Sequence, residues 1–185
     1  MAKMRYLVFK IEDDISVEDI RHLQLITRNG EIIHVDETQV MSLENLENYK
    51  IDLSYHRQIE YQKWLTQSDY YSHHIEHSKC SYVKNVLIDL RYNSLDTTQL
   101  KSILELWKGE DFWNLCQKMF RIDISQNRID MDGFIEIFQF IRHYCPNLKF
   151  LEANINFLKN SELEMLRQNG LIPDQIIDRF GYSSY

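Results

Sequence analysis

The sequence predicts a single α/β domain in which short parallel strands alternate with helices and stack into a curved solenoid. Two observations support this fold class. An eight-residue pattern recurs along the chain, and apolar residues at helical spacing follow each copy from residue 86 onward. The length of 185 residues suits one domain, and a count of 5 glycines and 2 prolines argues against long linkers.

The recurring pattern has two apolar residues separated by one intervening residue. An asparagine stands three positions after the second of them, and a further apolar residue stands two positions after the asparagine. Its copies run over residues 88–95, 122–129 and 151–158, and a weaker copy begins at Ile51 with His56 in the asparagine position. The first two apolar residues point to the same side of a short strand, and the asparagine amide can bond backbone groups of the turn that follows. Because one copy cannot bury its own apolar face, neighbouring copies are expected to stack.

These copies resemble the leucine-rich repeat, in the longer-period form with an outer helix that occurs in ribonuclease-inhibitor-like proteins. Asn93, Asn127 and Asn156 stand 34 and 29 positions apart. The family's period is roughly 20–29 residues, so the first spacing implies an insertion of about five. The resemblance covers residues 86–171 well and residues 46–84 poorly. It implies a short curved parallel sheet with helices on its convex side.

The pattern divides the domain into three parts. Residues 1–50 lack it and are predicted to form an N-terminal cap, residues 51–171 form the repeat region, and residues 172–185 form a C-terminal cap. Residues 68–81 are predicted to be a long loop. Strands are expected at residues 4–11, 31–35, 51–53, 86–90 and 121–124, and helices at residues 16–27, 38–49, 59–65, 97–108, 131–144 and 161–168.

Stacking of the copies would create a row of acids on the concave face of the sheet. The residue between the two apolar strand positions is acidic in every copy, namely Asp52, Asp89, Asp123 and Glu152. The residues just beyond the strands that would border this row include Arg91, Tyr92, Gln126 and Asn154. Tyrosine and arginine are enriched where binding energy concentrates, so we interpret these eight residues as a partner-binding surface.

The charge of the row suggests a basic partner, although a second interpretation stays open. Acids in register on adjacent strands repel by up to ~1 kcal/mol per pair, and a cationic ligand would relieve this cost. Alternatively, the acids only solubilise an exposed sheet, and Arg91 and Arg121 pair with them locally.

Composition narrows the remaining function classes. The formal charge of −7 disfavours nucleic-acid binding through a basic surface. The three cysteines form no disulfide framework, which points to a reducing compartment. Residues 1–10 do not resemble a signal peptide, and no apolar run approaches the 18 residues of a membrane span. We therefore expect a cytoplasmic protein that does not bind membranes.

The sequence contains no established catalytic motif, and we expect neither an enzyme nor a cofactor. His73, His74, His77 and Cys80 could hold zinc, but no second ligand pair follows, so a solvated loop is the simpler interpretation. Cys116 and Cys145 are expected to be small buried residues, and Phe112, Trp113 and Phe120 are expected to lie in the core.

These observations predict a non-catalytic protein-binding module. Its acidity, small size and resemblance to an inhibitor-type repeat suggest an immunity or inhibitor protein that neutralises a basic toxin or enzyme. An adaptor or scaffold subunit of a larger assembly is an alternative. A metal-dependent enzyme that uses His73, His77 and acids at the strand ends is a further one.

Overall fold

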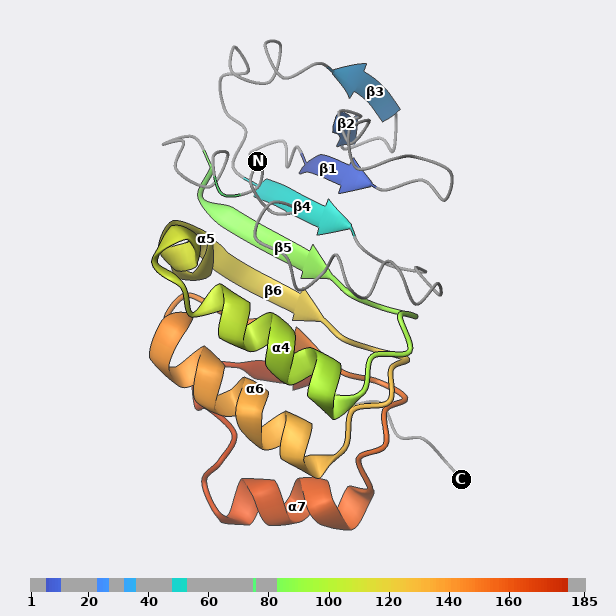
Figure 1. Ribbon diagram of the computed structural model, residues 1–185, viewed down its shortest axis with the longest axis vertical. Coiled ribbons are helices and arrows are strands. Elements are labelled where there is room, and N and C mark those ends of the chain that lie inside the picture. The colour runs from blue at the N-terminus through green and yellow to red at the C-terminus, as the bar shows by residue number, and fades with distance from the viewer. Residues whose placement is uncertain are drawn as a thin grey trace.

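The computed structural model describes residues 6–10, 23–26, 32–35, 48–52, 75 and 83–179. These residues form one mixed α/β unit with a single open sheet (Figure 1). Its strands are ordered β3-β2-β1-β4-β5-β6-β7-β8. They span Tyr6–Lys10 (β1), Leu23–Ile26 (β2), Ile32–Val35 (β3), Asn48–Asp52 (β4), Asn85–Asp89 (β5), Met119–Asp123 (β6), Phe150–Glu152 (β7) and Ile177–Arg179 (β8).

The strands β1, β4, β5, β6, β7 and β8 lie side by side in this order, and each pairs in parallel with the next. β2 and β3 add an antiparallel edge beside β1. From β4 onward each strand lies beside the next one in the chain. Right-handed crossovers that advance in one direction place all their helices on the same face of a sheet. Figure 1 shows α4 (Thr97–Trp107), α6 (Met131–Tyr144) and α7 (Asn160–Gln168) on one side of the sheet, following one another in the same order as the strands.

Three of the described helices, α4, α6 and α7, agree closely with the sequence prediction, whereas α5 (Trp113–Lys118) and the short 3-10 helix η3 (Glu110–Phe112) before it were not predicted. Asp96 and Asp130 cap α4 and α6, because each side chain accepts a hydrogen bond from a first-turn backbone N–H. Each of these two helices buries one apolar stripe, which includes Leu100 and Trp107 in α4 and Phe134 and Ile141 in α6.

The core lies between these helices and the sheet. Ile51, Ile88, Ile122 and Leu151 occupy the same register position on four successive strands, and all are buried. The prediction that the equivalent apolar positions lie side by side is therefore confirmed. The side chains at alternate positions of the same strands point to the other face of the sheet, which is called the open face below.

Three buried asparagines connect the turns that leave β5, β6 and β7. The Nδ2 groups of Asn93, Asn127 and Asn156 each donate to the carbonyl three residues back, at 2.9, 2.8 and 3.2 Å. Asn127 Nδ2 also donates to Leu90 O in the preceding turn, and its Oδ1 accepts from the backbone N–H groups of Asn93 and Leu95. The side chains thus supply the turn hydrogen bonds that the backbone cannot make alone. The predicted role of the asparagines is confirmed.

The residue before each asparagine has the same unusual backbone. Tyr92, Gln126 and Ile155 have φ values of 61°, 57° and 57°, in the left-handed region that L-residues seldom occupy. Shared strand register, shared asparagine bonding and shared turn conformation make these three segments structurally equivalent units.

Several expectations for the N-terminal half require correction or lie outside the described residues. Residues 23–26, expected to be helical, form β2, because pairing with β1 and β3 supplies hydrogen bonds that local periodicity cannot reveal. Residues 48–49, expected to end a helix, are the first two residues of β4, because they pair with β1 and β5. Residues 38–47 and the helix expected at 59–65 lie outside the described residues. Ile75, the only described residue of the predicted loop at 68–81, is helical and buried.

The two expected caps contribute strands to the sheet. β1 lies beside β4 and β8 lies beside β7, both in parallel. The chain ends therefore extend the same hydrogen-bonded ladder as the repeat region. The division into caps and repeats stays a prediction.

Candidate functional site

The open face carries the acids that the sequence placed in one row. Asp52, Asp89, Asp123 and Glu152 occupy one register position on β4, β5, β6 and β7. Each follows directly after the buried apolar residue of its strand, so the side chains of Asp89, Asp123 and Glu152 leave the opposite side of the sheet. The predicted adjacency of these four positions is confirmed, and what they bind stays a prediction.

Three cations link Asp89, Asp123 and Glu152 of this row in a continuous series of ion pairs, which we call the charge chain. Its members alternate in sign in the order Lys50, Asp89, Arg91, Asp123, Arg121 and Glu152. The successive nitrogen–oxygen distances are 3.0, 2.7, 3.4, 3.7 and 2.8 Å. Arg91 binds Asp89 in a bidentate way, from Nε to Oδ1 at 2.8 Å and from NH2 to Oδ2 at 2.7 Å.

The acids of the charge chain lie beneath its cations. The side chains of Asp89, Asp123 and Glu152 are 5%, 6% and 14% exposed, whereas those of Lys50, Arg91 and Arg121 are 26%, 36% and 41% exposed. The sequence interpretation treated the acids as an exposed row, and for Asp89 and Asp123 that expectation is wrong. Local pairing with Arg91 and Arg121, the alternative interpretation, is the arrangement observed, except that the acids are buried. Long arginine side chains reach over short aspartates, which accounts for the difference.

The two central aspartates have opposite pKa shifts. Burial alone would raise the pKa of Asp89, but the hydrogen bond from Arg91 and the charge of Lys50 outweigh it, so this pKa lies below its ordinary value. Burial raises the pKa of Asp123 above its ordinary value, and the negative charge of Asp89 adds to the shift. Hydrogen bonds from Ser125 offset this only in part. The two aspartates therefore differ in electrostatic environment although they share a register position.

The remaining predicted residues form the border of the open face beyond the strand ends. Gln126 Nε2 donates to the Tyr92 hydroxyl at 2.5 Å, which joins two successive turns. The backbone N–H of Asn154 donates to Ser125 Oγ at 3.1 Å, which joins the next pair. Tyr92, Gln126 and Asn154 are half-buried. All eight predicted residues thus belong to one face or its border, and Asp52 is placed there by its backbone register.

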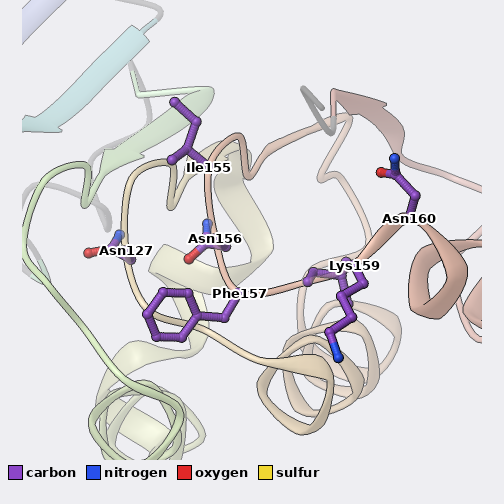
Figure 2. A pocket seen from close by; sticks show the side chains of 7 residues that line it. Asn127, Ile155, Asn156, Phe157, Lys159 and Asn160 are labelled. Atoms are coloured by element: carbon purple, nitrogen blue, oxygen red, sulfur yellow. The ribbon is translucent and has the colours of Figure 1, made fainter. Parts of the chain in front are cut away.

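Sequence reasoning missed a pocket of ≈ 650 Å³ in the turn that follows β7. Figure 2 shows Ile155, Phe157 and Lys159 around it, beside the turn asparagines Asn127 and Asn156. Ile155 and Phe157 are 46% and 63% exposed. A signal was present, because Phe157 occupies the position held by Ser94 and Arg128 in the two preceding units. An apolar side chain where equivalent turns are polar indicates a contact site.

The described residues give little support to a metal site or a cysteine nucleophile. No three histidine, cysteine or acidic side chains of the described residues come together as metal ligands, and His73, His77 and Cys80 lie outside those residues. Cys116 and Cys145 are buried as expected. The neighbouring Cys116 thiol, followed by burial, raises the pKa of Cys145, which disfavours a nucleophilic thiolate.

Among the aromatic residues assigned to the core, Phe112 is buried and Phe120 is half-buried. Trp113 is 54% exposed, so its assignment is wrong. It is the first residue of α5, and this short helix buries Leu115 and Cys116 instead.

Comparison with known proteins gives no family. No protein-family model matches the chain, and no curated protein matches it. Within the part of the chain that the structure describes, none of the helices has the length and apolar character required to cross a bilayer.

Proposed function

We propose that this chain is a leucine-rich-repeat-like solenoid that binds another protein, without catalysis, through the open face of its sheet. Three features of successive strand–turn units support the solenoid. They share a buried apolar register position, a buried asparagine and a left-handed residue before it. On this proposal residues 1–50 and 172–185 close the two ends of the stack.

The contrast between the two faces of the sheet is the observation that carries the binding role. The covered face presents apolar side chains to α4, α6 and α7. On the open face the same strands present the charge chain and half-buried Leu87 and Phe150. A sheet face that carries arginine and aromatic side chains, and that no described helix covers, has the composition of a protein-binding surface.

Two forms of this role differ in what happens to the partner. An immunity or inhibitor protein would abolish the activity of a toxin or enzyme, whereas an adaptor would leave its partner active inside a larger assembly. An activity assay of the captured partner, with and without this protein, separates the two forms.

The proposal can be tested by placing a photoreactive benzoylphenylalanine at Phe150 on the open face. The matched control places the same group at Met165, which is exposed on α7. Illumination of native-host cells should crosslink a partner from position 150 and leave it uncaptured from position 165. Equal crosslinking from both positions, or crosslinking from position 165 alone, would show that the open face is not the binding surface.

A further inference from the structure

The charge chain determines which sign of charge a partner meets on the open face. Its acids and cations are equal in number, but they differ in depth, with Asp89 and Asp123 almost fully covered and Arg91 and Arg121 more than a third exposed. A partner that approaches this face therefore contacts guanidinium groups before it can reach a carboxylate. Short-range complementarity depends on these outer groups.

Arg121 has the strongest potential for an external contact. Among the described residues its guanidinium makes one hydrogen bond, from NH2 to Glu152 Oε2 at 2.8 Å, and Nε and NH1 make none. Its side chain is 41% exposed. A guanidinium presents five N–H donors in a fixed fork that matches a carboxylate. Arg121 can thus keep Glu152 and still bind a second carboxylate from solvent.

Apolar surface lies directly beside Arg121. Phe150 occupies the neighbouring register position on β7, and Leu87 occupies the corresponding position on β5. Both are half-buried. The Phe150 ring contacts Phe120 edge-on, with centroids 5.3 Å apart, which holds it in place. An arginine flanked by fixed apolar side chains is a typical centre of binding energy.

We infer that the open face binds an acidic segment of the partner protein, with a partner carboxylate on Arg121 and an apolar partner side chain against Phe150. This inference rests on the proposed function and reverses the charge that the acidic row suggested for the partner. A basic segment could reach Asp89 only by displacing Lys50 and Arg91, which would break the bidentate pair. An acidic segment needs no such displacement. The formal charge of −7 provides no long-range attraction for it, so the affinity comes from contacts at the face.

A displayed library of random peptides tests the chemistry without knowledge of the natural partner. Peptides selected on the wild-type protein should be enriched in aspartate and glutamate. Arg121→Gln should weaken their binding about tenfold, because one charge-assisted contact is lost. Arg121→Lys should weaken it less, since the charge stays and the fork is lost. The control Arg167→Gln makes the same change in net charge on α7 and should leave binding unchanged. Thermal unfolding of each variant checks that the fold is intact.

Each other outcome of the selection counts against the inference in a distinguishable way. Basic or uncharged peptides that lose affinity when Phe150 is replaced would overturn the acidic partner and leave the proposed function standing. Peptides that are insensitive to both Arg121→Gln and Phe150→Ala, or a selection without enrichment, would contradict the acidic partner and the open-face binding role together.

Discussion

The two faces of the sheet differ in how strictly each unit repeats. On the covered face Ile88, Ile122 and Leu151 are all aliphatic, share one register position and are fully buried. On the open face the equivalent acids Asp89 and Asp123 share a register but have opposite pKa shifts. Core packing thus imposes uniformity on one face, and the other face is free to vary from unit to unit. Variation on a rigid scaffold is how repeat proteins acquire individual partners.

The largest effect is expected where the repeat is most uniform, in the three buried turn asparagines. Asn127→Ala removes an amide that bonds backbone groups of two successive turns and leaves those groups buried. We expect a loss of about 3–5 kcal/mol in the free energy of unfolding, measured by urea denaturation. Asn160→Ala, at an exposed position of α7, should change it by less than about 0.5 kcal/mol. A loss below about 1 kcal/mol for Asn127→Ala would show that the turn asparagines do not hold the units together.

The same substitution at Asp89 and at Asp123 tests whether the environments of the two carboxylates differ. Asp89→Asn removes one of two oxygens that accept from Arg91 and should cost about 1–3 kcal/mol. Asp123→Asn keeps an oxygen for the Ser125 N–H and removes a charge that burial disfavours, so it should cost less than about 1 kcal/mol. Denaturation of both variants at pH 7 gives the two values. Equal costs would mean that the two carboxylates have equivalent environments.

The opposite pKa shifts also predict opposite pH dependences. Because the pKa of Asp89 is lowered in the folded state, its contribution is complete above the ordinary value of 3.8 and is lost as the pH falls through the lowered pKa. The raised pKa of Asp123 makes ionisation unfavourable to folding. The wild type should therefore gain stability relative to Asp123→Asn as the pH falls from 7 toward 3.8, and should lose its advantage over Asp89→Asn only below that value. Denaturation series at several pH values would reveal a constant difference if either assignment is wrong.

The smallest effect is expected in the left-handed turn after β7. Ile155 is β-branched, which makes its φ of 57° costly, and half of its side chain is exposed. Ile155→Asn should stabilise the protein by about 0.5–1 kcal/mol, because asparagine tolerates this conformation. Ile155→Val retains the branch and serves as the control, with no gain expected in thermal unfolding. A loss of stability in Ile155→Asn would mean that the exposed isoleucine contributes more to packing than its conformation costs.

Sequence patterns predicted the parts of the molecule that repeat. The apolar positions of the strands, the three turn asparagines and the limits of α6 are local features with a strict period, and the structure reproduces them. The strand β2 was mistaken for a helix because its identity depends on pairing with β1 and β3. Periodicity over four residues cannot separate the two possibilities.

The spacing of residues in the sequence could not predict the electrostatics of the open face. The sequence placed Asp89 and Asp123 in register but could not show their depth. That depth depends on Arg91 folding back over two carboxylates and on Arg121 reaching diagonally to Glu152. Side-chain paths of this kind are set by tertiary packing, so the partner charge inferred from the acidic row differs from the charge favoured by exposure.

The most direct test of the binding role uses the partner that crosslinks from position 150. Titration calorimetry with the purified proteins measures the affinity of this protein for that partner. Phe150→Ala on the open face should weaken binding by about thirtyfold, whereas Met165→Ala on α7 should leave the dissociation constant unchanged. Unchanged affinity for Phe150→Ala together with weaker binding for Met165→Ala would place the interface on the helical side and contradict the account.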